Sequence, residues 1–249
     1  MARTVRASRP FRLDGARNAR DLGGYPTKYG INTAAGQFIR SDNPSKFTEE
    51  DLDRLYKYGV RLQLDFRSSG ETVKEPSKLQ GYKDIEFTNP QLMDTIVNAE
   101  GQTAMPPTLG ELYIGFIDNK QHIFLGMFKS ILENHMDDCV LFNCTAGKDR
   151  TGTFAMIMLK LAGCSDEVVA IDYAVTGDNI RPDMDALIEE YASRGIKVND
   201  DDARSRPLHI HLALKHMKDT YGTVEQWMEK VGLTAAEIDQ LRNKILGQF

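Results

Sequence analysis

Apolar and polar side chains alternate along residues 60–66, and this period of two predicts a β-strand with one polar face. The strand places Asp65 and Arg67 at its carboxyl end. A helix is expected just before it, because Thr48 is a good N-cap, three acidic residues follow where a first turn favours them, and Gly59 suits the helix end. The pattern therefore predicts a helix followed directly by a strand.

A second strand is predicted by the apolar run 140–142, and the apolar spacing from Thr153 to Leu161 predicts a helix. Between them lies a short segment that runs from Cys144 to Arg150. In open α/β sheets the ligand crevice lies at the carboxyl ends of the strands. This segment and the end of the first strand are therefore expected to meet at one edge of the sheet.

Most of the remaining chain has helical patterns. Residues 109–134 predict a pair of helices, residues 166–175 and 183–193 predict one each, and capping boxes at Thr223 and Thr234 predict two more. These elements together predict an α/β fold. Its central, mostly parallel twisted sheet has about four to five strands, flanked by helices, and the C-terminal part is a helical elaboration.

The chain is predicted to form a single domain over residues 1–249, with a basic tail over about residues 1–12. Two interpretations are open for the helices of about residues 180–220: they pack on the sheet in the ordinary way, or they form a lid over the site. An exposed acidic loop is expected at Asn199–Asp202.

Composition limits the function. Hydrophobic residues make up 41% of the 249 residues, which is enough for a sizeable core. The net charge of −5 argues against a nucleic-acid-binding surface, so an anionic ligand would be attracted by a local positive pocket. The sequence has no apolar run long enough to span a membrane, so stable membrane insertion is not predicted. The chain is expected in the cytoplasm, or outside the cell if a leader has been removed, and its oligomeric state is open.

Cysteine and histidine spacing argues against disulfides and metals. Three cysteines do not make an extracellular disulfide framework, and Cys139 is expected to pack in the core. His209 and His211 are two positions apart and would diverge on a helix, unlike the ligands of a metal site. No metal or other cofactor is therefore predicted.

The candidate chemistry lies in the segment from Cys144 to Arg150, which has the spacing C-x5-R. A loop between a strand and a helix points backbone N–H groups at one spot, beside the positive end of the helix dipole. Such surroundings favour a thiolate over a thiol, and the planar fork of Arg150 can hold two phosphate oxygens at once. Gly147 lets the loop curl. A nucleophile beside an anion cradle suggests attack on a phosphate ester.

Neighbouring side chains are expected to extend this cradle. Lys148 adds positive charge at its rim, and the hydroxyl of Thr151 would help the sulfur leave a phosphoenzyme. Asn18, Arg20 and Asp21 are expected to form either a buried hydrogen-bond clasp, which we prefer, or part of the pocket wall. The predicted phosphate-binding residues are Thr145, Ala146, Gly147, Lys148, Asp149, Arg150, Thr151, Arg67 and Arg20.

The string from Cys144 to Gly152 resembles the signature of cysteine-dependent protein tyrosine and dual-specificity phosphatases, usually H-C-x-x-G-x-x-R-[ST]. Its G-K-D-R-T-G form is similar to that of a bacterial branch that includes secreted Listeria and mycobacterial tyrosine and phosphoinositide phosphatases. Residues 18–25, 38–41 and 65–71 resemble other segments of that branch, and the likeness covers most of the chain. It implies a cysteine-phosphatase-like fold and the hydrolysis of phosphomonoesters. Phosphotyrosine is the default substrate, and phosphoserine, phosphothreonine and phosphoinositides are further candidates.

The resemblance also implies roles for single residues. Cys144 would form a phosphocysteine intermediate, Arg150 would bind the phosphate, and Asp65 would protonate the departing oxygen, with Asp149 as the second candidate acid. The partner would be a phosphorylated protein or a phosphoinositide. Asn143 stands where the family has histidine, and its amide is expected to donate hydrogen bonds to the loop instead. The alternative function is a phosphate-binding pseudophosphatase or interaction module, with weak turnover because of Asn143.

Overall fold

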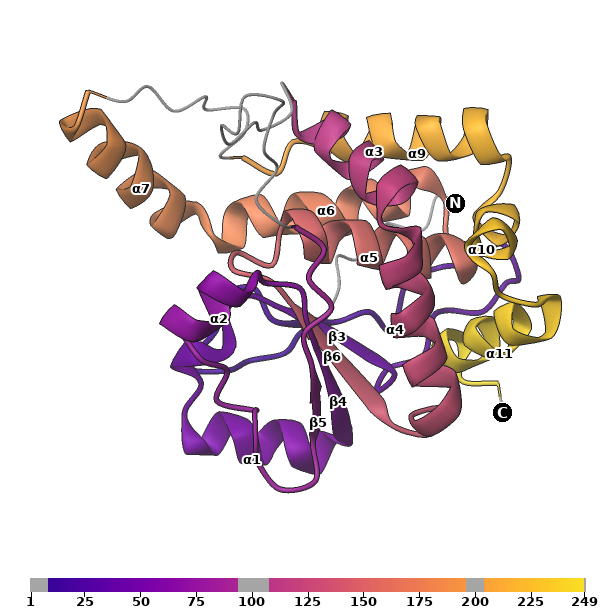
Figure 1. Ribbon diagram of the computed structural model, residues 1–249, viewed down its shortest axis with the longest axis horizontal. Helices are drawn as coiled ribbons and strands as arrows, with labels where there is room; N and C mark the ends of the chain where they lie inside the picture. Colours follow the sequence, from indigo (N-terminus) through magenta and orange to yellow (C-terminus); the bar gives the residue numbers. More distant parts are fainter. Residues whose placement is uncertain (1–8, 94–107, 196–203, 249) are drawn as a thin grey trace.

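The computed structural model describes residues 9–93, 108–195 and 204–248 (Figure 1). Its centre is a six-stranded sheet with the strand order β1-β2-β3-β6-β4-β5. The strands β3, β6, β4 and β5 run parallel, and β1 and β2 continue the sheet as antiparallel strands. The strand bounds are β1 Arg9–Pro10, β2 Arg20–Asp21, β3 Phe38–Ser41, β4 Val60–Asp65, β5 Glu86–Thr88 and β6 Cys139–Asn143.

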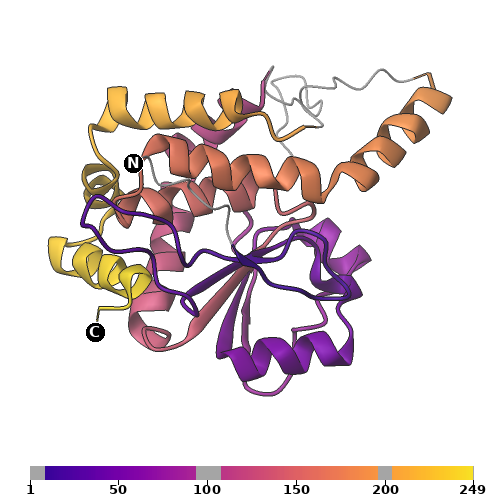
Figure 2. The ribbon, with the colours of Figure 1, turned by 180° about the vertical axis from the view of Figure 1, so that it is seen from behind.

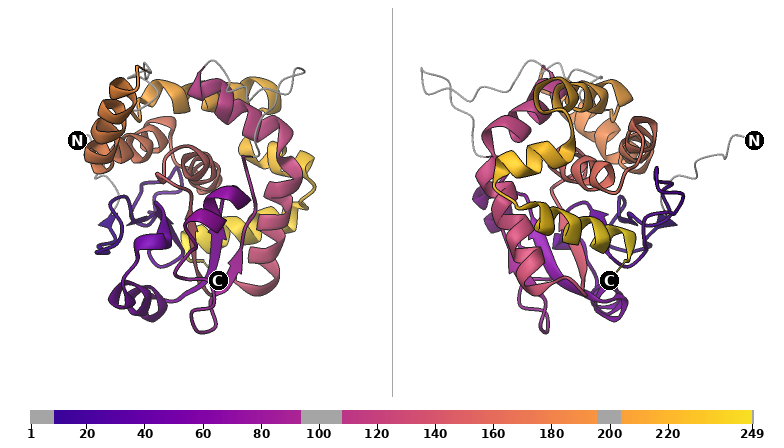
Figure 3. Two further views of the ribbon diagram at one scale, coloured as in Figure 1. Left: turned by 60° about the vertical axis from the view of Figure 1, so that its left-hand side comes forward. Right: turned by 90° about the vertical axis from the view of Figure 1, so that its right-hand side faces the viewer.

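Helices cover both faces of this sheet. The bounds in the first half are η1 Pro44–Lys46, α1 Glu49–Tyr58, α2 Ser69–Lys74, α3 Leu109–Asn119 and α4 Gln121–Asn134. The bounds in the second half are α5 Asp149–Leu161, α6 Asp166–Asn179, α7 Arg181–Ser193, α9 Pro207–Tyr221, α10 Val224–Val231 and α11 Ala235–Leu246. Figure 3 shows α1 and α4 on opposite sides of the sheet.

The central strand β6 shows how the pleat divides the core into two parts. Val140 and Phe142 point into the larger cluster, which joins the sheet to α3, α4, α5, α9, α10 and α11. Cys139 and Leu141 point the other way, into a smaller cluster with α1. Because neighbouring strand residues face opposite sides, a continuous apolar run is what a strand buried on both faces requires. The predicted packing role of Cys139 is confirmed.

Helix α5 passes through the middle of the helical layer, and nearly all its residues are buried. It begins where the loop after β6 ends, so the loop from Cys144 to Lys148 is fixed at both ends by buried elements. The sequence placed this helix at Thr153–Leu161, and its start lies one turn earlier. The first turn has polar side chains that interact with the site rather than with the core, which hid it from the apolar pattern.

The predicted fold class, a mostly parallel sheet flanked by helices, is confirmed. The strand expected over residues 60–66 is β4, and the helix before it begins after Thr48 and ends at Gly59. The capping boxes at Thr223 and Thr234 are both formed. The sheet has one strand more than predicted, because β1 and β2 are two residues long and have no alternation to reveal them.

The described helices of residues 180–220 differ in their packing, and the lid interpretation stays a prediction. Helix α9 packs against α3 and α6, which is ordinary packing. Helix α7 has no buried residue and extends away from the rest of the molecule in Figures 1 and 2. The acidic loop expected at 199–202 lies outside the described residues. No helix in the described part of the chain is both long and apolar enough to cross a membrane.

Candidate active site

The loop after β6 is held from behind by its carbonyl groups. The side-chain amide of Asn18 donates to the carbonyl oxygen of Ala146 at 2.9 Å and to that of Gly147 at 3.1 Å. The guanidinium of Arg40 also donates to the Gly147 carbonyl, at 2.7 Å. The Thr145 carbonyl accepts from the backbone N–H of Asn43 at 3.0 Å. Three successive carbonyls therefore point toward the body of the protein.

This arrangement determines where the loop's N–H groups point. In a trans peptide the C=O and N–H directions are opposite, and the described chain has no cis peptide. The N–H groups of Ala146, Gly147 and Lys148 therefore point away from the side on which the three carbonyls are held. Within the described residues, no hydrogen bond involves the N–H of Ala146 or Gly147. A concave set of such N–H groups, at the N-terminus of α5, binds anions.

Gly147 is required at the tightest point of the loop. Its φ is +65°, a backbone conformation that favours glycine. A Cβ atom there would lie 2.7 Å from the Ser41 carbonyl oxygen and 2.9 Å from the Asp42 nitrogen. Both of these are backbone atoms of the segment after β3. The sequence-based role of Gly147 in curling the loop is therefore supported by its conformation and by its surroundings.

Arg150 is held at the loop by a carboxylate that sequence analysis did not place there. Its guanidinium donates to Glu71 through two nitrogens, at 2.7 and 2.9 Å, and to the Thr145 hydroxyl at 3.3 Å. Burial alone would lower the pKa of Arg150, but the hydrogen bonds to Glu71 and the charge of Cys144 raise it. The guanidinium stays charged. Burial would likewise raise the pKa of Glu71, and its bonds to Arg150 and Thr145 lower it instead.

The capping box at the start of α2 explains why the contact between Glu71 and Arg150 was not predicted. Ser68 and Glu71 form a capping box at the start of α2, in which Glu71 accepts from the Ser68 N–H at 2.8 Å. That pattern is complete in itself and predicts only a helix start. The contact to Arg150 joins residues 79 positions apart and has no local signature.

Beneath the loop, Asp172 joins two buried arginines. It pairs with Arg20 at 2.9 Å and with Arg40, and all three side chains are at most 2% exposed. Arg20 also donates to Asn18 and Thr176, so each of its nitrogens is engaged. Asn18 and Arg20 thus bond to each other as expected, whereas Asp21 accepts from Gly23, Gly36 and Tyr58 instead. These contacts give Arg20 a structural role, and its predicted binding of phosphate stays a prediction.

Asp65 and Arg67 form another buried pair at the end of β4. Two Arg67 nitrogens donate to the Asp65 carboxylate at 2.6 and 2.9 Å, and both side chains are at most 1% exposed. Arg67 also donates to Asn43 at 2.7 Å. The geometry favours this ion pair over the two roles predicted from the sequence, in which Asp65 was the acid and Arg67 a phosphate ligand. Both oxygens of the Asp65 carboxylate accept hydrogen bonds from Arg67, and burial keeps the group away from solvent.

Asn143 belongs to the same polar network. Its side-chain oxygen accepts from Gln63 at 2.8 Å, and its amide donates to Asp65 at 3.1 Å. Ser77 in turn donates to Gln63 at 2.8 Å. The amide of Asn143 was expected to support the loop, and that expectation is wrong, because its hydrogen bonds go to β4 and not to the loop.

Asp149, the second candidate acid, lies at the loop itself. Its Oδ1 accepts from the Tyr113 hydroxyl at 2.5 Å and lies 3.6 Å from the Lys148 ammonium. Its side chain is 28% exposed, unlike that of Asp65, so solvent and ligands can reach it. The Thr151 hydroxyl is buried and has no hydrogen-bond partner among the described residues. It is therefore available to a group in the loop.

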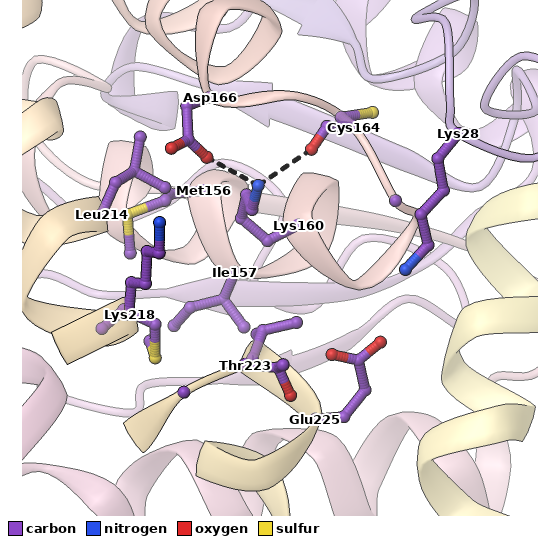
Figure 4. Close-up of a pocket in the computed structure, with 14 residues that line it drawn as sticks. Lys28, Met156, Ile157, Lys160, Cys164, Asp166, Leu214, Lys218, Thr223 and Glu225 are labelled. Atoms are coloured by element: carbon purple, nitrogen blue, oxygen red, sulfur yellow. Dashed lines mark hydrogen bonds and ion pairs between the residues drawn. The ribbon is translucent and has the colours of Figure 1, made fainter. Parts of the chain in front are cut away.

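Two cavities differ in their relation to this loop. One of about 710 Å³ borders it at Thr145 and Ala146. Its other walls come from residues 14–17, from the segment 42–46 with Glu75, and from residues 180–184 at the start of α7. The other, of about 350 Å³, lies at the far end of α5 (Figure 4). There Lys160 is already bonded to Asp166 at 2.6 Å and to the Cys164 carbonyl at 3.1 Å. Only the first cavity adjoins the candidate chemistry.

Comparison with known proteins identifies the family of this chain. The family model described as "Tyrosine phosphatase family" matches residues 11–247. The chain belongs to the tyrosine phosphatase family. It is 30% identical over 223 residues to a tyrosine-protein phosphatase of Nostoc commune, covering 86% of this chain and 75% of that one. It is also 26% identical over 261 residues to a putative tyrosine-protein phosphatase of Cupriavidus necator, covering 98% and 91%.

A third relative of this phosphatase matches over a shorter stretch. It is the triple specificity protein phosphatase PtpB of Mycobacterium tuberculosis, 25% identical over 122 residues, which are 43% of this chain and 44% of that one. The resemblance to bacterial tyrosine and dual-specificity phosphatases is confirmed. The protein is thus an enzyme of the phosphatase class, and its expected substrates are phosphorylated molecules. Within the described residues, no cluster of side chains is suited to hold a metal ion.

Proposed function

We propose that the protein hydrolyses phosphotyrosine through a phosphocysteine intermediate on Cys144. The observation that carries this proposal is the loop in which three carbonyls are tied back, so that the opposite N–H groups face outward beside Arg150. Such a cradle suits a phosphoryl group, whose charge is spread over three oxygens in the transition state. Cys144 is the nucleophile that the loop contains.

In the first step the Cys144 sulfur attacks phosphorus and the bond from phosphorus to the tyrosine oxygen breaks. The loop N–H groups and Arg150 hold the three remaining oxygens. Asp149 gives its proton to the departing oxygen, which leaves as a neutral phenol. The proposed products of this step are the dephosphorylated substrate and a phosphocysteine.

In the second step a water oxygen attacks phosphorus and the sulfur–phosphorus bond breaks. The Asp149 carboxylate takes the proton of that water and is ready for the next cycle. The Thr151 hydroxyl, buried and without a partner in the described structure, would donate to the departing thiolate. Inorganic phosphate is then released, and the two steps replace one difficult displacement.

Asp149 is preferred to Asp65 as the acid for two reasons. Asp149 is partly exposed beside the loop, whereas Asp65 is buried and held twice by Arg67. A general acid must also come within reach of the oxygen that leaves. The first residue of α5, directly before Arg150, satisfies this condition by its position in the chain.

Phosphotyrosine is proposed as the main substrate class from the family. The name of the mycobacterial relative, a triple specificity phosphatase, supports including phosphoserine and phosphothreonine among the substrates to be tested. Lys148 supports including phosphoinositides, because an additional cation in the loop favours additional phosphates. A turnover panel of these three substrate classes, without added metal, ranks them directly.

The alternative is a phosphate-binding pseudophosphatase with weak turnover. It was suggested by Asn143, but the side chain of this residue bonds to Gln63 and Asp65. The loop is held by other residues, through its carbonyl groups. The active-enzyme proposal therefore does not depend on position 143. Binding of vanadate without turnover of any panel substrate would establish the alternative.

The mechanism is tested by Cys144→Ser in an assay with p-nitrophenyl phosphate. Turnover should be lost, while the folded variant still binds vanadate, because the loop N–H groups and Arg150 are retained. Cys164→Ser is the matched control, since Cys164 is equally buried but lies at the far end of α5. Full activity in Cys144→Ser would overturn the proposal.

A further inference from the structure

Two buried tyrosines connect Asp149 to the helical layer. Tyr113 comes from α3 and Tyr173 from α6, and their side chains are 0% and 1% exposed. The Tyr113 hydroxyl donates to Asp149 Oδ1 at 2.5 Å, and the two hydroxyl oxygens are 2.6 Å apart. The rings pack edge to face, with their centroids 5.9 Å apart. The three side chains form a continuous hydrogen-bonded chain.

The Asp149 carboxylate fixes the donor direction of both hydrogen bonds. A carboxylate oxygen accepts hydrogen bonds, so Tyr113 uses its single hydroxyl proton toward Asp149. The Tyr113 oxygen can then only accept, and Tyr173 must donate to it. Burial raises the pKa of both tyrosines, and the charge of Asp149 raises it further. Both hydroxyls therefore keep their protons at neutral pH.

The hydrogen bond of Asp149 is made by one of its two oxygens. Tyr113 donates to Oδ1, the Lys148 ammonium lies 3.6 Å from the same oxygen, and no hydrogen bond to Oδ2 is formed in the described structure. Since Tyr113 already donates to Oδ1, a proton bound to Asp149 belongs on Oδ2. The carboxyl group is thus oriented by one oxygen and carries its transferable proton on the other.

We propose that Tyr113 is the positioning residue of the general acid, and that Tyr173 orients the Tyr113 hydroxyl. By holding Oδ1, Tyr113 presents Oδ2 to the leaving group. This inference rests on the proposed function, in which Asp149 is the acid. Neither tyrosine transfers a proton, and no bond is made or broken at either ring.

The test compares two aryl phosphates that differ in their need for an acid. p-Nitrophenolate leaves readily without protonation, whereas the phenolate of phenyl phosphate leaves poorly. In Tyr113→Phe, kcat for phenyl phosphate should fall by roughly 10- to 100-fold, part of the contribution expected of a general acid. The kcat for p-nitrophenyl phosphate should fall much less. Tyr173→Phe should show the same selectivity with a smaller loss.

Asp149→Asn provides the reference, and Tyr221→Phe is the matched control. Asp149→Asn should show the same selective loss, and adding Tyr113→Phe to it should cause little further loss on phenyl phosphate, because both act through one proton transfer. Tyr221, the last residue of α9, also donates to a carboxylate, that of Asp118 on α3, at 2.7 Å. Its replacement should leave both rates unchanged.

The outcomes separate this inference from the proposed function. If Asp149→Asn shows the selective loss and folded Tyr113→Phe shows none, or loses both activities equally, the positioning role is overturned and the acid assignment stands. If the wild-type protein hydrolyses neither substrate, the proposed function fails and the inference fails with it. If Tyr113→Phe does not fold, the same criteria apply to Tyr173→Phe.

Discussion

The Glu71 carboxylate grips the Arg150 guanidinium with both of its oxygens, at 2.7 and 2.9 Å. The same carboxylate caps α2 through the Ser68 N–H and accepts from the Thr145 hydroxyl. One side chain thus ties a helix start to the phosphate loop. A paired fork of this kind fixes the plane of the guanidinium, so that its Nε–H is oriented before substrate binds.

Replacing Glu71 by Gln should separate its two roles. Gln can still close the capping box, so the start of α2 should be retained. The charged grip on Arg150 is lost, and kcat/KM for p-nitrophenyl phosphate should fall roughly 10- to 100-fold, since a hydrogen bond between charged groups contributes about 1.5–3 kcal/mol. Glu75→Gln is the control, because Glu75 bonds to Asn43 and not to Arg150. Equal activity of the two variants would contradict this role.

Replacing Asp172 by Asn should destabilise the protein strongly at neutral pH. It leaves Arg20 and Arg40 buried without their counter-charge, and breaking a buried ion pair in this way costs about 3–5 kcal/mol. Urea unfolding measures the loss. Asp178→Asn is the control, because Asp178 pairs with Arg181 on the surface and is 78% exposed. A loss of stability no larger than that of the control would contradict the stabilising role of the Asp172 ion pairs.

The same residue predicts a pH dependence. Burial alone would raise the pKa of Asp172, but Arg20 and Arg40 lower it to about 2 from the usual 3.8. A carboxyl group whose pKa is lowered by folding stabilises the folded state above its unfolded pKa and loses that contribution as pH falls through the folded pKa. The wild type should therefore lose stability between about pH 4 and pH 2 through this group, and Asp172→Asn should lack that part of the loss. An equal fall in the stability of both proteins over this pH range would contradict the assignment.

Asn143→Ala should destabilise the central strands. It leaves the Gln63 amide without its buried acceptor and removes one of the donors to Asp65, which costs about 1–3 kcal/mol. Chemical denaturation measures the loss, and a double-mutant cycle with Gln63→Ala should show coupling above about 0.5 kcal/mol. Additive effects of the two changes would mean that this contact contributes nothing.

Local patterns were sufficient to predict much of the fold. The alternation along residues 60–66 and the apolar run 140–142 gave two central strands, and the capping boxes at Thr223 and Thr234 gave two helix starts. These signals work because each depends on neighbours within a few positions. The strands β1 and β2 are too short to show a period. They form because β3 offers an edge to β2, and β2 in turn offers one to β1.

The site was predicted where its chemistry is local and missed where it is not. Cys144 and Arg150 are six positions apart in one loop, so their spacing was visible. The partner of Arg150 is Glu71, and the partner of Asp149 is Tyr113, and both come from distant elements. Asp65 shows how a position in the sequence leaves the direction of a side chain open. Its place at a strand end suggested an acid, but its carboxylate turns to Arg67 two residues away.

The central claim is that the phosphoryl group passes through the sulfur of Cys144. It is tested most directly by stopping turnover of p-nitrophenyl phosphate with detergent and mapping covalent phosphate by mass spectrometry of peptides. The account predicts a phosphoryl group on Cys144, more of it in Asp149→Asn, where attack by water lacks its base, and none in Cys144→Ser. Steady turnover by a wild-type enzyme with no phosphoryl group on Cys144, or with one on another residue, would contradict it.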